Sequence, residues 1–270
     1  MSRAKILIAL CLTVLFLAVS CVIAGEEYSE DFSKTLPLKA GQRLSLENVN
    51  GPVALTTWTE DKVEIKAVKT SRRSEEELAK VEIRVEESAG GVSVKAIWPK
   101  FPRRARVSVA FEVRAPEGVV LDGVGTVNGN VEVSGRFERG DVGTTNGDVT
   151  IEGGSGELEV STTNGSIRVR RFDGRIEADT TNGNVRLEDL TFKGGLSAGT
   201  TNGSITVSLT NAEGLNADLR AHTTNGSVTV DFPVTLKNLS QSRRRVEARI
   251  GQGGPLIELG TTNGSIRITK

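Results

Sequence analysis

Histidine and cysteine, two residue types that commonly serve in catalysis or bind metals, are scarce in this 270-residue sequence. The chain has one histidine, His222, and two cysteines, Cys11 and Cys21. Disulfide frameworks, thiolate zinc sites and cysteine–histidine nucleophile pairs are therefore excluded from the body of the chain. A serine–histidine–aspartate triad would have to use His222. We expect no catalytic residues, no metal site and no cofactor, and we interpret His222 as an ordinary surface or corner histidine.

Aromatic side chains that could stack on sugars are also scarce. Trp58, Trp98 and Tyr28 are the only tryptophan and tyrosine residues, and none lies in the repeats described below. Many sugar-cleaving β-helix enzymes combine such aromatics with paired carboxylates, and no carboxylate pair recurs here at matched positions. An enzyme acting on polysaccharides is therefore the weakest functional hypothesis.

The charge balance argues against nucleic acid as a partner. Lysine plus arginine number 34, and aspartate plus glutamate also number 34, so there is no basic excess to neutralise phosphates. Two local basic clusters stand out, at residues 100–106 and at Arg243-Arg244-Arg245. Either could touch anionic surface groups, but on a near-neutral protein we favour solvated loops.

The first 24 residues are predicted to be a signal peptide. A short positive segment precedes an apolar run from Ile6 to Ala24, and glutamates follow instead of a cationic flank, as is typical of export signals. Cleavage before Gly25 is one interpretation. The alternative is that residues 18–21, which resemble a bacterial lipobox, place a lipid on Cys21. Both predict an exported protein of the periplasm, outer membrane or cell surface, membrane-associated only through a retained signal or lipid anchor.

A tetrapeptide repeat organises the chain after about residue 120. Thr-Thr-Asn-Gly occurs six times, Thr126-Val127-Asn128-Gly129 is a near-copy, and Asn48-Val49-Asn50-Gly51 is a degenerate copy upstream. The steps between successive repeat asparagines are 18, 18, 18, 20, 23 and 38 residues. The last step is about two periods, so we expect that one copy is missing or overwritten. The repeat asparagines are Asn128, Asn146, Asn164, Asn182, Asn202, Asn225 and Asn263.

The flanks of each Asn-Gly predict two short strands per repeat. Aliphatic residues stand three and five positions after every asparagine, and an apolar residue stands four positions before it, a period typical of strands. Each Asn-Gly could be a hairpin turn, or the corner of a β-solenoid whose like residues stack about 4.8 Å apart. We favour the solenoid, because the apolar face shifts phase across the corner, as it does where strands turn around a core.

In a solenoid the repeat asparagines would form a structural ladder. Stacked amides can hydrogen-bond along the axis, and the glycine that follows would supply a positive φ. The same dipeptide is the one most open to deamidation when flexible, because glycine leaves the succinimide route unhindered. We therefore expect a packed ladder to protect these asparagines while the chain is folded.

The region from 25 to 120 is less regular. Several alternating segments predict strands, and Ser74-Glu75-Glu76-Glu77 predicts a capping box that opens a short helix through about Lys80. The fold prediction is an all-β, parallel β-solenoid of about 18-residue coils with two strands per coil, with irregular N-terminal coils carrying a short helix. Residues 25–270 would form one domain, with 25–120 as divergent coils and cap and 121–270 as regular repeats. A separate β-sandwich over 25–120 is the alternative.

Residues 45–53, the following Trp58 and the Thr-Thr-Asn-Gly-Ser-Ile series resemble the bacterial "putative adhesin" family of unknown function, a group of exported β-helical proteins. The resemblance covers nearly the whole chain after the signal peptide and implies adhesion at the cell surface. We therefore predict a non-catalytic cell-envelope protein, a rigid scaffold whose partner would be a cell-surface polymer or an envelope protein. Because related domains occur in envelope-stress sensing proteins, the alternative is a sensing domain that acts through a membrane partner.

Overall fold

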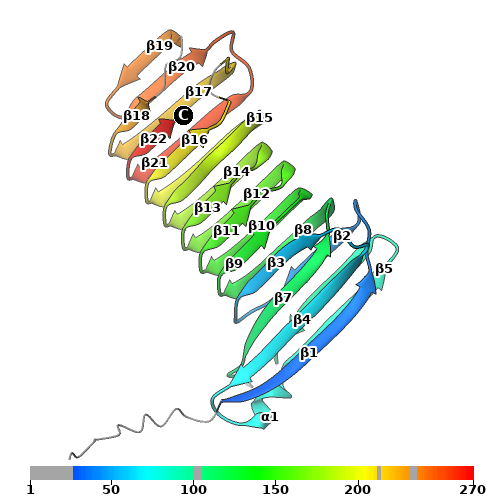
Figure 1. Cartoon of the computed structure of the whole chain (residues 1–270). Helices are drawn as coiled ribbons and strands as arrows, with labels where there is room; N and C mark the ends of the chain where they lie inside the picture. Colours follow the sequence, from blue (N-terminus) through cyan, green and yellow to red (C-terminus); the bar gives the residue numbers. More distant parts are fainter. Residues whose placement is uncertain (1–26, 100–104, 212–213, 232–235) are drawn as a thin grey trace, which may run out of the picture.

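The structure is a computed structural model, and it describes residues 27–99, 105–211, 214–231 and 236–270. The predicted signal peptide and Cys21 lie outside the described residues, as does most of the basic cluster at residues 100–106. The chain is almost entirely β-strand, wound into an elongated stack (Figure 1). Both predictions of an all-β fold and of solenoid-like parallel stacking are confirmed.

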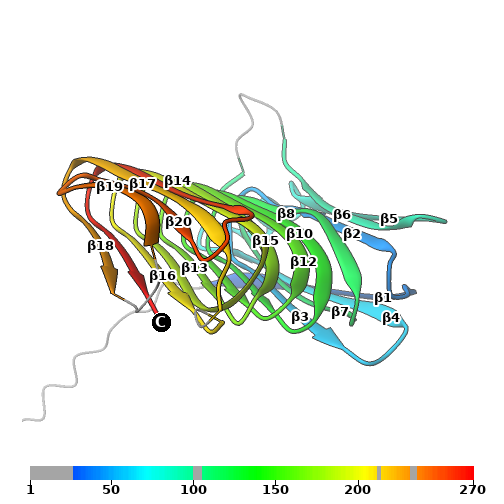
Figure 2. The same ribbon diagram turned by 90° about the horizontal axis from the view of Figure 1, so that it is seen from above.

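Two series of strands form the long walls of the stack, which Figure 2 shows from above. We call them sheet A and sheet B; β15 (Val185–Asn202) bends from sheet A into sheet B. Along the stack, sheet B consists of β5 (Glu82–Ser88), β6 (Gly91–Ile97), β2 (Arg43–Glu47), β8 (Val119–Asn128), β10 (Phe137–Asn146), β12 (Ser155–Asn164), β14 (Asp173–Asn182), the second part of β15, β21 (Leu256–Asn263), β17 (Ala217–Asn225), β20 (Arg245–Ile250) and β19 (Leu236–Ser242).

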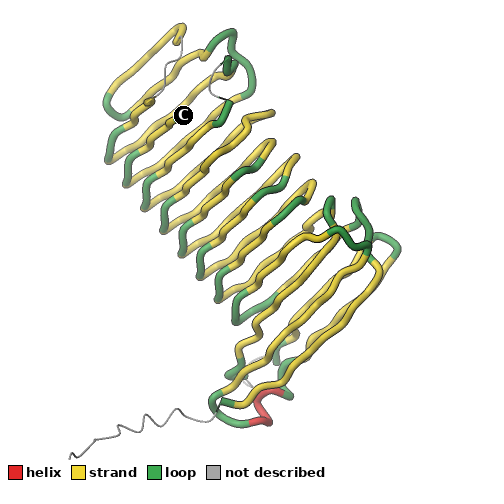
Figure 3. Tube along the Cα trace, in the orientation of Figure 1, coloured by secondary structure: helices red, strands yellow, loops and turns green. Residues whose placement is uncertain are grey.

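Sheet A follows the same axis. In order along the stack, its strands are β1 (Tyr28–Pro37), β4 (Lys62–Ser71), β7 (Ser108–Pro116), β3 (Val53–Trp58), β9 (Val131–Ser134), β11 (Val149–Glu152), β13 (Ile167–Arg170), the first part of β15, β16 (Ile205–Leu209), β22 (Ile266–Thr269) and β18 (Val228–Asp231). The corners that join the sheets line up along one side of the stack (Figure 3).

Equivalent residues of successive repeats pair in parallel. Val142 lies opposite Val160, and Val160 lies opposite Ala178. The strands before and after an Asn-Gly belong to different sheets, as β10 and β11 do, so the hairpin alternative is wrong. The physical reason is the phase shift of the apolar face: Val142 points inward from sheet B, and after the corner Val149 points inward from sheet A.

The last coil is not the last layer of the stack. β21 lies between β15 and β17, and β22 lies between β16 and β18. Leu259 therefore packs in register between Ala198 and Ala221. The expectation of a missing copy in the 38-residue step is wrong, because that segment forms the β19–β20 hairpin, which pairs antiparallel to the outer side of β17.

The first coil is inserted in the same way. β2 lies between β6 and β8, and β3 lies between β7 and β9. Beyond these layers β1, β4 and β5 pair antiparallel to their neighbours. The strands of residues 27–120 thus continue both sheets of the repeats, in part as coils and in part as antiparallel strands.

A short helix, α1 (Glu75–Leu78), closes the N-terminal end. It starts after Ser74 as predicted, but the Ser74 side chain makes no capping hydrogen bond to the helix backbone. The buried Lys69 instead satisfies the other end, because its Nζ donates to the carbonyl oxygens of Leu78 at 3.3 Å and Val81 at 3.1 Å. No helix of the described residues is long and apolar enough to cross a membrane.

Candidate binding face

The structure brings the seven repeat asparagines, which are exposed, and the half-buried Asn50 into one row along a corner. Each side-chain amide Nδ2 donates to the Oδ1 of the asparagine one layer nearer Asn50, at 2.7–2.9 Å. The row runs in the order Asn50, Asn128, Asn146, Asn164, Asn182, Asn202, Asn263 and Asn225. Amides aligned in this way link each layer to the next independently of the backbone.

The threonine two positions before each of the seven repeat asparagines reinforces the same corner. Its side chain is buried, and its hydroxyl donates to the carbonyl oxygen of a glycine in the adjacent layer; Thr180, for example, bonds to Gly165 at 2.9 Å. Glycine is required here by this close approach. The expectation of a positive φ holds at four of the corner glycines and fails at the other four, Gly165, Gly183, Gly203 and Gly226. At Gly165 and Gly183 an added Cβ would overlap the carbonyl of the preceding layer.

Asn182→Ala is expected to lower the free energy of unfolding by about 1 kcal/mol, because it leaves Asn164 Oδ1 and Asn202 Nδ2 without their amide partner. Asn50→Ala should lower the free energy of unfolding by less, because Asn50 stands at the end of the row and shares one side-chain hydrogen bond with a neighbouring asparagine. Urea denaturation of both variants measures the difference. Equal losses of stability in the two variants would show that the hydrogen bonds between asparagines of successive layers do not contribute to stability.

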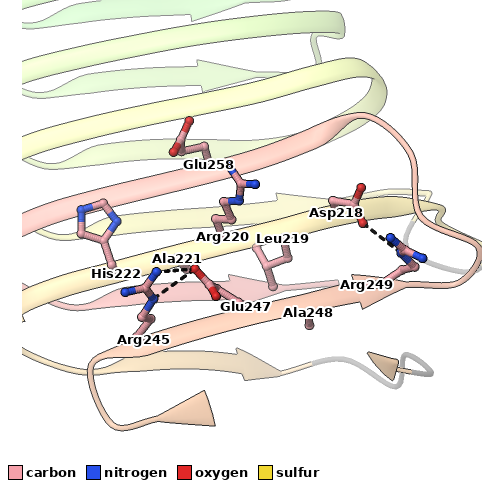
Figure 4. Close-up of a pocket in the computed structure, with 10 residues that line it drawn as sticks. All are labelled: Asp218, Leu219, Arg220, Ala221, His222, Arg245, Glu247, Ala248, Arg249 and Glu258. Carbon is pink, nitrogen blue, oxygen red and sulfur yellow. Dashed lines mark hydrogen bonds and ion pairs between the residues drawn. The ribbon is translucent and has the colours of Figure 1, made fainter. Parts of the chain in front are cut away.

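The outer surface of sheet B is hollowed near its C-terminal end. A hollow of about 790 Å³ lies over β17, β20 and β21, and Figure 4 shows charged side chains projecting from all three strands. Asp218 pairs with Arg249 at 3.4 Å, and Glu247 pairs with Arg245 at 2.5 Å. His222 lines the same hollow opposite Arg245 and is exposed, as expected of a surface histidine.

Smaller hollows continue the depression along sheet B. One of about 340 Å³ lies between Arg175 and Glu258, and another of about 260 Å³ lies between Arg43 and Glu177. We call the outer face of β8, β10, β12, β14, the second part of β15, β21, β17 and β20 the trough. Its floor includes small residues at one register position, Gly125, Gly143, Ser161, Gly199 and Gly260, with Asp179 between Ser161 and Gly199.

The trough is acidic along most of its length. One register row contains the outward side chains of Asp122, Asp141, Glu159, Glu177, Ser197, Glu258 and Arg220 in that order. Like charges on adjacent strands repel. Beside this row, burial and then the charge of Glu177 raise the pKa of the Asp179 carboxyl above its usual value.

The C-terminal end of the trough is cationic by comparison. Arg220, Arg245 and Arg249 line the hollow there together with His222, and Arg243 and Arg244 are exposed on the neighbouring turn. Hydrogen bonding from Arg245, together with its charge, holds the pKa of Glu247 below the usual value. At this end of the trough, carboxylates and guanidinium groups form ion pairs with one another, as Glu247 does with Arg245 and Asp218 with Arg249.

The described residues of the trough offer polar contacts from charged side chains. Among the described residues, no three histidine, cysteine, aspartate or glutamate side chains are grouped to hold a metal ion. Trp58 is on sheet A, where its Nε1 donates to Lys62 O at 2.8 Å. Sequence reasoning identified the asparagine row and His222 but missed the trough. The available signal was the outward residue three positions before each buried threonine, which is charged in most repeats.

Together, the parallel stacking, the corner row and the polar trough define an all-β, solenoid-like protein built from repeats. The chain belongs to the Toastrack DUF4097 family, whose model matches residues 32–269. This confirms the family resemblance inferred from the sequence. No curated protein matches the chain.

Several solved structures match most of the chain at low sequence identity. A "putative cell adhesion protein" from Clostridium sporogenes is 14% identical with a TM-score of 0.36, over 89% of this chain and 99% of that one. A "putative adhesin" from Bacteroides fragilis is 13% identical with a TM-score of 0.46, over 88% and 97%. A "putative lipid binding protein" from Parabacteroides distasonis is 12% identical with a TM-score of 0.44, over 89% and 97%.

Proposed function

We propose that this protein is an exported, non-catalytic scaffold of the cell envelope, whose stiff solenoid presents the trough to a surface polymer or an envelope protein. The observation that carries the proposal is the trough itself, because it continues along successive layers and offers polar side chains at the same outward position in each. A coil of about 18 residues is the repeating unit of this surface. Adjacent layers about 4.8 Å apart would let an extended ligand make the same contact repeatedly.

Charge narrows the class of ligand. The acidic row from Asp122 to Glu177 has no arginine or lysine at its own register positions, so a neutral or cationic polymer fits the trough better than a polyanion. An anionic group would find guanidinium partners near Arg220 and Arg245, whereas Arg139 and Arg175 in the acidic stretch stand among carboxylates of the same hollow.

Binding of the purified protein to cell-wall polymers and envelope proteins tests the proposal. Glu159→Ser/Glu177→Ser in the trough is expected to weaken saturable binding about tenfold, a change of about 1.4 kcal/mol. Glu132→Ser/Glu188→Ser, which removes the same charge from the outer face of sheet A, should leave binding unchanged. Equal effects of the two changes would show that the trough is not the binding face.

The same experiment separates the alternatives. Capture of one regulatory membrane protein would replace the scaffold by the sensing role. Turnover of a glycan that a single aspartate or glutamate substitution abolishes would replace both by an enzyme. Binding that survives His222→Ala without turnover supports the scaffold, because His222 is the one imidazole in the chain.

A further inference from the structure

The corner at the C-terminal end of the asparagine row differs from the seven others. In those seven, the backbone N–H of the glycine after the asparagine donates to the backbone carbonyl of an asparagine one layer on, at 2.8–3.0 Å; the donors are Gly51, Gly129, Gly147, Gly165, Gly183, Gly203 and Gly264. Gly226 follows Asn225, the last of the row. Among the described residues its N–H has no partner, because no further asparagine layer lies beyond it.

The two ends of the row are not equivalent. At Asn50, Gly51 N–H donates to Asn128 O at 2.8 Å, and Asn50 O accepts from Val109 N–H at 2.8 Å. At Asn225 the side chain donates to Asn263 Oδ1 at 2.8 Å, but no described residue donates to Asn225 Oδ1. Asn225 is exposed and Gly226 is half-buried, so water reaches this corner.

We propose that Asn225 is a site of spontaneous deamidation in the folded protein. The nitrogen of Gly226 attacks Cγ of Asn225 and loses its proton to water. The Cγ–Nδ2 bond breaks, and Nδ2 leaves as ammonia, which gives a succinimide. Water then adds to either carbonyl carbon of the ring, opening it to aspartate or isoaspartate at position 225. At the other seven corners the attacking nitrogen is held in a hydrogen bond that would first have to break.

The modification would change the charge of the cationic end of the trough. The turn that carries Arg243 and Arg244 flanks this corner, since Thr223 N–H donates to Arg244 O at 2.9 Å and Val228 N–H donates to Arg243 O at 3.0 Å. Neither arginine side chain has an ion-pair partner among the described residues. A carboxylate formed at position 225 would lie near these cations, and it would lack the Nδ2 donor that now bonds to Asn263.

Site-resolved peptide mass spectrometry of the full chain, incubated at neutral pH, tests the proposal. We expect aspartate plus isoaspartate to form at Asn225 about tenfold faster than at any other repeat asparagine, a factor equal to about 1.4 kcal/mol, which is the size of one hydrogen bond. In urea all eight sites should react at similar rates. Similar rates in the folded chain, or a faster site elsewhere in the row, would overturn the proposal.

Ammonia release from two matched variants gives a second test that does not depend on peptide mass spectrometry. Glutamine forms the corresponding ring far more slowly, so Asn225→Gln should remove most of the ammonia that the folded protein releases early. Asn50→Gln, at the other end of the row, should leave that release unchanged. Circular dichroism before incubation checks that both variants are folded. Equal ammonia release from the two variants would contradict the assignment to Asn225.

Discussion

Removal of residues 251–270 is expected to unfold the C-terminal third of the stack. The removed segment is an inner layer, and its Ile257, Leu259, Ile266 and Ile268 are almost fully buried. Burial of each such side chain contributes about 1.5–3 kcal/mol, so the loss approaches the whole stability of a typical domain, about 5–15 kcal/mol. Hydrogen exchange should show that β17, β18 and the second part of β15 lose amide protection.

The control changes the same coil without removing it. Glu258→Ser/Arg267→Thr alters only outward side chains and should change stability by no more than about 0.5 kcal/mol. Protection that persists in β17 of the shortened chain would contradict the expectation. It would mean that the coil at 217–231 restacks directly on β15, which the shared Thr-Thr-Asn-Gly register permits.

The possibility that the coil at 217–231 stacks directly on β15 explains which features of the fold the sequence could predict and which it could not. The repeat specifies which residues face each other, because Thr, Asn and the flanking aliphatic residues occupy equivalent positions in every copy. It does not specify which copy lies next to which. Asn202 is able to pair with Asn225 or Asn263 in the same register, and the observed order places Asn263 first. The 38-residue spacing between Asn225 and Asn263 therefore predicted a missing or overwritten copy, whereas the structure has the β19–β20 hairpin in this segment.

The N-terminal strands show a related limit. Alternation in segments such as 62–66 and 81–85 predicts strands, but it holds no information on strand direction. β4 and β5 are antiparallel to their neighbours, and both lie outside the inserted first coil. The first and last coils thus both lie inside the stack, with further strands beyond them in each sheet. Their edges are paired on both sides. Antiparallel strands face three of the four sheet ends, at β1, β5 and β19, and the parallel strand β18 forms the fourth; open edges at such ends would invite aggregation.

The candidate binding face depends on the same arrangement. Each outward acid is visible in the sequence, but the hollow near His222 forms because Glu258 stands beside Arg220, and β20 pairs on the other side. The positions of β21 and β20 on either side of β17 could not be predicted from the order of the strands along the chain. The asparagine row was accessible to prediction since it uses one residue type at one repeat position, whereas the trough combines different side chains from layers that the sequence does not order.

Gly183→Ala is expected to destabilise the protein by about 3 kcal/mol, the upper range for overpacking a close-packed interior. Its added Cβ would overlap the carbonyl oxygen and carbon of Gly165, which are backbone atoms that cannot rotate away. The φ of Gly183 lies outside the left-handed range, so the cost arises from contact between layers. The shift of the urea denaturation midpoint, with the slope unchanged, measures it.

Gly90→Ala is the matched control. Gly90 is exposed, its φ is also outside the left-handed range, and an added Cβ would stand 3.8 Å from the nearest atom, Ser88 Oγ. We expect a change within about 0.5 kcal/mol. The layers around Gly183 cannot separate to admit a methyl group without lengthening two hydrogen bonds. These are the bond between the Asn182 and Asn164 side chains and the bond from the Thr180 hydroxyl to Gly165 O, both 2.9 Å. Similar stabilities of the two variants would therefore mean that neither the ladder nor the threonine bonds set the spacing of the coils.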